Sequence, residues 1–261
     1  MTSELFDNEI VIDDDTPSIV TPDGMSTGYM AGARTTPYGR MATTTPFPDE
    51  LLIPQSEWQA RIAEKEQLKN RISDLVLQAN LPSKNQQQTN YCWCNAPTGT
   101  VEMLRVIQNE PMVKLSAASV GGPITGYKNV GGWGEAALKY IVDNGIVPES
   151  LWPVNAISSK YHTPANVQAA LDYRIVGWYE LVPKNTNQMI SCLLRNIPVA
   201  VGLNWWGHEV VFCDAVWLNG AIAIRFRNSW GDGFGSQGFS VLQGTKILAD
   251  DAVCPLSTVA A

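Results

Sequence analysis

The stretch Lys84–Trp93, which reads KNQQQTNYCW, contains the cysteine around which we expect the rest of the chain to be arranged. A helix-like stretch with periodic apolar residues, 101–108, follows Cys92. A thiol at a helix N-terminus beside a histidine has a lowered pKa, because both stabilise the thiolate. A thiolate attacks carbonyl carbons, so Cys92 is a candidate nucleophile. The alternative is that Cys92 is a small buried apolar residue.

A second motif, Gly131-Gly132-Trp133, lies about forty residues further along the chain. Glycine has no Cβ, so an extended peptide could approach this backbone closely and form hydrogen bonds with it. The same glycine pair also fits a tight turn, and both interpretations remain open.

The third motif concerns a histidine and an asparagine that are distant in sequence. His208 precedes a predicted strand at 209–217, and Asn219-Gly220 predicts a tight hairpin into a second strand at 221–227. This hairpin brings His208 and Asn228 to the same end of the sheet. An ideal two-residue turn misaligns them by about three residues, so we expect a bulge or a longer loop.

Asn228 opens the sequence Asn228-Ser229-Trp230-Gly231. A neutral asparagine oxygen that accepts a hydrogen bond from an imidazole fixes the tautomer and the orientation of the ring. A neighbouring tryptophan keeps water away from that bond. The alternative is that His208 is a structural histidine with satisfied hydrogen bonds.

These motifs resemble, in the same order along residues 81–245, those of papain-like cysteine peptidases. The resemblance implies an α+β fold with two lobes, one helical and one β-barrel-like, and a cleft between them. It implies hydrolysis of peptide bonds through a Cys-His-Asn triad and a thioester intermediate, with no cofactor.

The resemblance also assigns roles to individual residues. The catalytic residues are Cys92, His208, Asn228 and Gln86, of which Gln86 donates to the oxyanion together with the Cys92 N–H. The substrate-binding residues are Gly131, Gly132 and Trp133, where Trp133 walls the pocket for the second side chain on the acyl side. The supporting residues are Trp93 and Trp230.

Three departures from the family pattern put the substrate pockets in doubt. Glu209 stands where a small residue usually follows the histidine, the preceding loop is shortened to 204–207, and Phe234 replaces a usual tryptophan. A fourth position, Thr89, holds a disulfide-bonded cysteine in secreted members. Its replacement favours a cytoplasmic or virion-associated protein over a secreted one.

The chain has five cysteines, an odd and scattered set that does not predict a disulfide framework. Cys92, Cys94 and His208 could form a metal site, but the sequence has no second Cys-x-x-Cys and no clustered histidines. We therefore expect no metal. The acidic start also lacks the basic and apolar regions of a signal peptide, and no apolar run is long enough to span a membrane.

We divide the chain into four parts. Residues 1–54 are an extended acidic arm rich in Thr and Pro, and 55–80 form a helical linker or docking helix. Residues 81–170 form the helical lobe with the nucleophile, and 171–261 the β-rich lobe with the histidine and asparagine.

The arm carries the whole charge imbalance of the protein, with nine acidic and two basic residues among residues 1–50. The rest of the chain has no net charge, which argues against nucleic-acid binding. Large apolar residues are sparse in the arm. They are Leu5, Phe6, Tyr29, Tyr38 and Phe47. We therefore expect a tether for assembly or self-association, rather than an inhibitor that fills the cleft, although a solvated tail remains open.

The expected partner is a peptide or protein substrate. The arm motivates an alternative function, in which the protein is a structural or adaptor component of a viral (phage) particle or another large assembly. Such a component would use the papain-like fold with little or no turnover.

Overall fold

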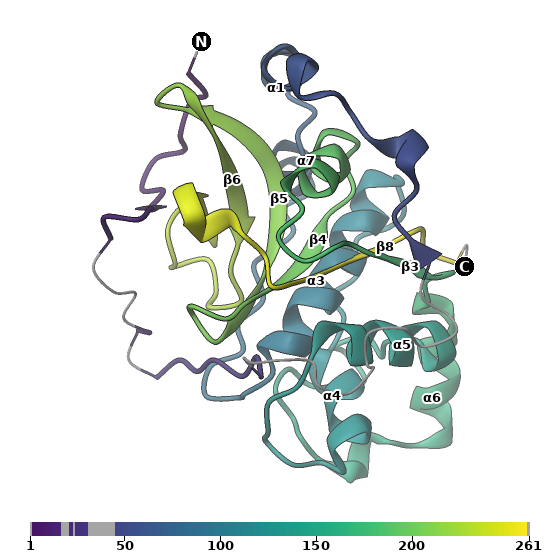
Figure 1. Cartoon of the computed structure of the whole chain (residues 1–261). Coiled ribbons are helices and arrows are strands. Elements are labelled where there is room, and N and C mark those ends of the chain that lie inside the picture. The colour runs from purple at the N-terminus through teal and green to yellow at the C-terminus, as the bar shows by residue number, and fades with distance from the viewer. Residues whose placement is uncertain (1, 17–20, 23, 31–44, 260–261) are drawn as a thin grey trace.

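A computed structural model describes residues 2–16, 21–22, 24–30 and 45–259 of the chain. The α+β prediction is confirmed, because helices pack on both faces of a mixed sheet (Figure 1). The strand order of the sheet is β1-β7-β6-β5-β4-β8-β3-β2. In the described part of the chain this sheet is open, so the expectation of a barrel-like β lobe is wrong.

The helices begin and end as follows: α1 Gln55–Leu68, α2 Ile72–Gln78, α3 Cys92–Ile107, α4 Ala117–Thr125, α5 Gly134–Asn144, α6 Pro164–Ala170 and α7 Thr186–Leu194. The strands are β1 Val11–Ile12, β2 Thr45–Pro46, β3 Trp178–Glu180, β4 Val199–Leu203, β5 His208–Leu218, β6 Ala221–Arg227, β7 Phe239–Gln243 and β8 Asp251–Pro255.

The two faces of the sheet are covered by different helices. Alternate residues of β4 and β5 point to opposite faces, so Val201 and Phe212 pack with α1 and α7, whereas Ala200 and Val211 pack with α3. Figure 1 shows α3 between the sheet and the helices α4 and α5. The N-terminus of α3 carries Cys92, so packing of this helix on the sheet positions the candidate nucleophile.

The segment 55–80, which we expected to be a helical linker or docking helix, forms two helices, α1 and α2. The chain turns at Lys69, whose φ of 51° is left-handed and ends α1. The first helix begins directly after Pro54. Trp58 and Ile62 of α1 are buried in the core beside α7. Docking of a partner by this segment stays a prediction.

The predicted hairpin forms as expected, with Leu218 opposite Ala221 and a turn at Asn219-Gly220. Both turn residues have positive φ, as two-residue hairpin turns of the primed type require. The predicted bulge is also present: the register shifts by one residue between Phe212 and Asp214. The shift moves Asn228 one position closer to His208 along the sheet.

The described parts of the arm lie on the body. β1 pairs in parallel with β7 and β2 with β3, so both edge strands of the sheet come from the arm. Among its large apolar residues, Phe47 is buried in the core and Phe6 contacts Phe239. Tyr38 lies outside the described residues.

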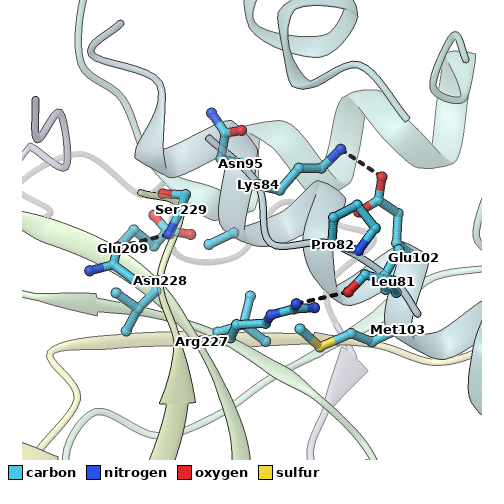
Figure 2. A pocket seen from close by; sticks show the side chains of 14 residues that line it. Leu81, Pro82, Lys84, Asn95, Glu102, Met103, Glu209, Arg227, Asn228 and Ser229 are labelled. Carbon is cyan, nitrogen blue, oxygen red and sulfur yellow. Dashed lines mark hydrogen bonds and ion pairs between the residues drawn. The ribbon is translucent and has the colours of Figure 1, made fainter. Parts of the chain in front are cut away.

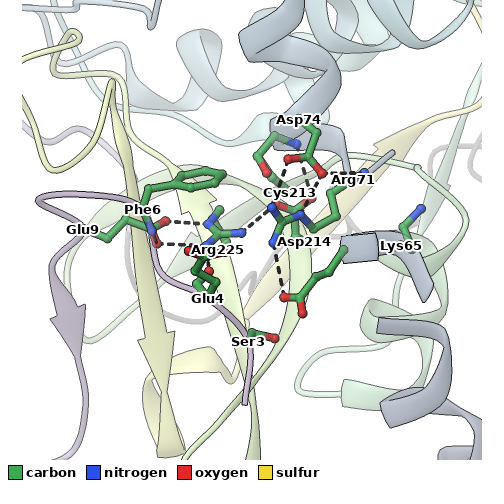
Figure 3. Close-up of polar contacts among 12 residues, drawn as sticks. Ser3, Glu4, Phe6, Glu9, Lys65, Arg71, Asp74, Cys213, Asp214 and Arg225 are labelled. Atoms are coloured by element: carbon green, nitrogen blue, oxygen red, sulfur yellow. Dashed lines mark hydrogen bonds and ion pairs between the residues drawn. The ribbon is translucent and has the colours of Figure 1, made fainter. Parts of the chain in front are cut away.

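A buried ion pair fixes the first part of the arm. The Glu9 carboxylate accepts from Arg225 Nε at 2.5 Å and Nη2 at 2.9 Å, and both side chains are fully buried. Figure 3 shows Arg225 between Glu9 and Asp214, with the Phe6 ring against its guanidinium. The arm is therefore held by specific side-chain contacts.

The described residues contain neither a membrane-spanning helix nor a metal-binding cluster. No helix among them has both the length and the apolar character that crossing a bilayer requires. No group of three or more His, Cys, Asp or Glu side chains in this part of the chain is arranged to hold a metal ion.

Candidate active site

His208 and Asn228 meet at one end of the β5–β6 hairpin. Their Nε2 and Oδ1 atoms lie 2.8 Å apart, and the Ser229 N–H donates to the same oxygen at 2.8 Å. If Nε2 carries the proton, Nδ1 is left as the acceptor nitrogen of the ring. The Trp230 ring stacks on the imidazole at 4.7 Å between centroids and excludes water from the bond.

Gln86 is fixed by the loop that follows Asn228. Its backbone N–H donates to Ser229 O at 2.8 Å, and its side-chain oxygen accepts from the Ser229 hydroxyl. These bonds leave its Nε2 to act as a donor toward the site. The sequence did not indicate this role of Ser229, because a serine between two motif residues has no distinguishing pattern.

Cys92 is the first residue of α3 and is completely buried. Burial raises the pKa of its thiol, and the nearby negative charge of Glu209 raises the pKa further. Backbone N–H groups of Glu209, Gly28 and Trp93 point at the sulfur and act weakly in the opposite direction. The expectation of a thiol whose pKa is lowered by the helix N-terminus is therefore wrong for this state, because loss of hydration outweighs the dipole.

Burial acts on His208 in the complementary direction. It lowers the pKa of the imidazole to about 4, although the hydrogen bond that the ring donates to Asn228 Oδ1 partly opposes the shift. A neutral thiol and a neutral imidazole are thus favoured together at neutral pH. The backbone N–H of Glu209 also acts on the Cys92 thiol. Glu209 directly follows His208 in the chain, so the start of β5 lies near the candidate nucleophile.

An arm segment, Ser26–Met30, covers these residues. The Ser26 carbonyl accepts from Gln86 Nε2 at 2.9 Å and from Trp230 Nε1 at 3.1 Å. Gly28 is in such close contact with the loop before α3 that an added Cβ would lie 2.0 Å from Asn90 O. The Ser26 carbonyl oxygen therefore already accepts a hydrogen bond from Gln86 Nε2, the group that we predicted to donate to an oxyanion.

The same segment pairs with the glycine motif. The Gly132 N–H donates to Gly28 O at 3.0 Å, and Met30 N–H donates to Gly132 O at 3.1 Å, which makes Tyr29 the parallel partner of Gly132. A Cβ on Gly131 would lie 2.4 Å from Gly28 O. The lack of a side chain at Gly131 allows this close approach.

Our expectation that the arm leaves the site open is wrong. Tyr29 is only 7 % exposed, and its ring lies directly over Gly202, where a Cβ would be 2.4 Å from the ring. One aromatic residue is enough to cover the site, because its small neighbours Ser26, Thr27 and Gly28 allow the backbone to lie close to the protein surface. Association of the arm with a partner stays a prediction.

A small pocket lies behind Asn228, between α3 and the sheet (Figure 2). Lys84 Nζ bonds Glu102 of α3 at 2.6 Å, and Arg227 Nη2 donates to Leu81 O at 2.8 Å. These contacts connect the loop that carries Gln86 to both α3 and β6. The five cysteines are free and buried, and the closest sulfurs, those of Cys192 and Cys254, are 4.0 Å apart.

Comparison with known proteins agrees with this arrangement. The family model described as "Papain family cysteine protease" matches residues 77–220. Ananain from Ananas comosus is 28% identical over 177 residues, which cover 60% of this chain and 50% of ananain. Digestive cysteine proteinase 3 from Homarus americanus is 26% identical over 185 residues, 60% of this chain and 56% of that protein. The chain spans about half the length of the curated relatives it matches.

Solved structures share the fold at lower identity. Xylellain, a cysteine protease from Xylella fastidiosa, superposes with a TM-score of 0.64 over 92% of this chain and 99% of its own, at 15% identity. A recombinant stem bromelain precursor gives a TM-score of 0.64 over 90% and 78%, at 18% identity. Because the family model covers more than half of the sequence and includes Gln86, Cys92 and His208, the chain belongs to the papain family of cysteine proteases.

Proposed function

We propose that the protein hydrolyses peptide bonds through a thioester on Cys92. The observation that carries this proposal is the buried hydrogen bond between His208 Nε2 and Asn228 Oδ1, 2.8 Å long. It orients the ring and makes Nδ1 the nitrogen that can take a proton from the thiol.

In the first half of the reaction, His208 Nδ1 takes the proton as the Cys92 sulfur attacks the carbonyl carbon. The electron pair of the C=O bond moves to oxygen, where Gln86 Nε2 and the Cys92 N–H stabilise it. The C–N bond then breaks, and His208 gives the proton to the leaving amine.

In the second half, His208 takes a proton from water, and the hydroxide attacks the thioester carbon. The C–S bond breaks, the acid is released and the proton returns to sulfur. The Gln86 donor suits this role, because a carbonyl oxygen, that of Ser26, is its partner at 2.9 Å.

The arm must leave before a substrate enters, and its direction explains why it is not itself a substrate. In a substrate, the second residue on the acyl side precedes the residue that is attacked. Here Tyr29, on Gly132, follows Gly28, whose N–H points at the sulfur. The segment therefore runs in the direction opposite to that of a substrate. None of its carbonyl groups lies at Cys92 with the preceding residue on Gly132, so the segment is not cleaved.

The test compares Cys92→Ala with the control Cys192→Ala, which removes a buried thiol on the other face of the sheet. Unchanged folding is checked by circular dichroism. Turnover of a peptide substrate and labelling by a thiol-directed epoxide should vanish in Cys92→Ala and persist in Cys192→Ala. Labelling that persists on another cysteine in Cys92→Ala would contradict the assignment.

The covering of Cys92 by the arm also fits the alternative, a structural or adaptor component of a large assembly with little turnover. The two functions differ once Ser26–Met30 is displaced, for example in Tyr29→Ala. A peptidase then gains reactivity at Cys92, whereas a folded protein that stays inert toward the epoxide and toward peptides would favour the structural function.

A further inference from the structure

Residues 128–130, which we name the pre-glycine loop, are hydrogen-bonded to the stretch 88–93 that leads into α3. The Asn129 side chain makes two of these bonds: its Oδ1 accepts from the Asn90 N–H at 2.7 Å, and its Nδ2 donates to Gln88 O at 3.2 Å. The Asn90 side chain returns a third bond, from its Nδ2 to Asn129 O at 3.3 Å. The Asn129 amide therefore pairs with the backbone as a peptide unit does in a strand, through one acceptor and one donor.

Two buried aromatic residues hold the other carbonyl groups of the pre-glycine loop. The Tyr91 hydroxyl donates to Lys128 O at 2.8 Å, and Trp93 Nε1 donates to Val130 O at 3.2 Å. The two rings contact each other edge to face, with their centroids 5.7 Å apart. Tyr91 precedes Cys92 and Trp93 follows it, so the loop is bonded to the chain on both sides of the nucleophile.

The loop leads directly into the glycine pair. A Cβ on Gly132 would lie 2.6 Å from the Trp93 ring, so the Gly132 backbone lies against this indole. The N–H and the carbonyl of Gly132 bond Gly28 and Met30 of the arm at 3.0 and 3.1 Å. The bonds of the pre-glycine loop therefore determine where this peptide-binding backbone lies relative to Cys92.

The connection between the two segments does not depend on sulfur. The residue in the position of the disulfide-bonded cysteine of secreted members is Thr89, and its hydroxyl donates to Gln86 O at 2.7 Å within the same loop. All five cysteines of the chain are free. The pre-glycine loop is therefore joined to the nucleophile segment by hydrogen bonds rather than by a covalent bond.

We propose that Asn129, together with Tyr91, is a positioning residue that holds the Gly132 backbone in place beside Cys92, so that a bound peptide contacts both. This inference rests on the proposed function. A loop that is in place for only part of the time weakens apparent binding by that fraction, so losing these bonds raises KM more than it lowers kcat. Asparagine suits the role because one short side chain carries both a donor and an acceptor.

The test uses the full chain in a Tyr29→Ala background, so that the arm competes less with a peptide substrate. Asn129→Ala loses two exposed hydrogen bonds, which corresponds to an increase in KM of about fivefold. Asn129→Asp keeps the acceptor for the Asn90 N–H and should give an intermediate KM. Asn144→Ala is the control, because its side chain bonds within its own helix, α5, and its KM should not change.

Two further measurements distinguish positioning from a general loss of structure. Alkylation of Cys92 by iodoacetamide, which reacts without pairing with Gly132, should be equal in Asn129→Ala and its parent. Tyr91→Phe removes only the hydroxyl, so it serves as the second variant should Asn129→Ala fail to fold, and it should also raise KM. A KM that none of these substitutions changes, or a loss confined to kcat, overturns the proposal.

Amide hydrogen exchange separates this inference from the proposed function, because it needs no turnover. In the full chain with Tyr29 intact, the Gly132 N–H should exchange faster in Asn129→Ala than in Asn144→Ala. Faster exchange in a protein that hydrolyses no peptide would support the positioning and refute the peptidase. Equal exchange in the two variants would refute the positioning, even if peptides are hydrolysed.

Discussion

Two of the described stretches of the arm contact the body in different ways. Residues 2–16 pair with β7 through β1 and are also held through side chains: the Glu9–Arg225 ion pair is fully buried, and the Phe6 ring lies 4.0 Å from the Arg225 guanidinium. Ser26–Met30 is held mainly through backbone groups on Gln86, Gly132 and Trp230, with the Tyr29 ring as its one buried side chain. The first stretch requires its own sequence, whereas another extended peptide could replace the second.

Residues 2–16 therefore anchor the arm to the body, whereas Ser26–Met30 covers the active site. Displacing Ser26–Met30 exposes Cys92 but leaves β1 and the ion pair intact, so opening the site does not require the whole arm to leave. The following changes test this separation, from the largest expected effect to the smallest.

Replacing Glu9 with alanine should destabilise the anchor most. It leaves Arg225 with only Asp214 as an acidic neighbour, at 3.5 Å, and an incompletely paired buried charge costs about 3 kcal/mol of unfolding free energy. Urea denaturation measures the loss. Glu4→Ala, at an exposed side chain of the same stretch, is the matched control. A loss below about 1 kcal/mol would mean that the anchor is not specific.

Acid should uncover the site. The pKa of buried His208 is about 4, against 6.5 for the ordinary imidazole, so the uncovered form binds more protons between these values. The covered form is therefore fully favoured above pH 6.5 and loses stability as the pH falls toward 4, by about 3 kcal/mol in total. Asn228 and Trp230 contact the ring, and Cys92 and Glu209 are the titratable groups near it.

NMR can follow this titration directly, because the chain has only two histidines and His162→Gln identifies the other signal. The His208 signal should stay neutral until about pH 4 while the arm covers it, and titrate nearer to 6.5 in Tyr29→Ala. A signal that titrates near 6.5 in the wild type would show that the imidazole is hydrated.

Gly28→Ala should displace the covering stretch and leave the anchor in place. The new Cβ would lie 2.0 Å from Asn90 O, which is part of the backbone and cannot easily move. An overpacking cost of about 2 kcal/mol corresponds to roughly 30-fold faster alkylation of Cys92. Gly233→Ala is the control, since nothing lies within 4 Å of its added Cβ. Equal alkylation rates in both variants would show that Gly28 does not determine the covering.

Asp14→Asn should have the smallest effect. The Asp14 carboxylate accepts from Thr245 N–H at 3.0 Å, and these bonds lower its pKa, but the group is exposed. Hydrogen exchange at Thr245 should increase without a measurable change in Cys92 alkylation. Faster alkylation in this variant would mean that the two stretches are coupled.

The features that could be predicted from the sequence are those that depend on local residue patterns and on the pairing of neighbouring strands. The helix after Cys92 and the Asn219-Gly220 hairpin follow from apolar periodicity and turn chemistry, and the bulge follows from counting residues between His208 and Asn228. His208 and Asn228 therefore meet because of the register between β5 and β6.

The sequence did not predict what depends on contacts between distant segments. No periodic pattern marks Ser26–Met30, because it binds through backbone groups that every residue has. Glu209 and Asp251 are likewise far apart in the chain, and only the pairing of β5 and β8 with β4 places both opposite Gly202. The pKa of Cys92 could not be predicted either, since it depends on the burial of the thiol in the folded protein.

The bulge at Cys213 makes the site sensitive to length rather than to composition. If Cys213 were instead paired in a regular ladder, Asn228 would be opposite Val211 instead of Val210, and the strand alternation would turn the asparagine away from the imidazole. Residues added at the Asn219-Gly220 tip would lie beyond Leu218 and Ala221, and the pairing below them would be preserved. A library of single-residue insertions in this hairpin would therefore tolerate changes at the tip and reject them between His208 and Cys213, whatever residue types were used.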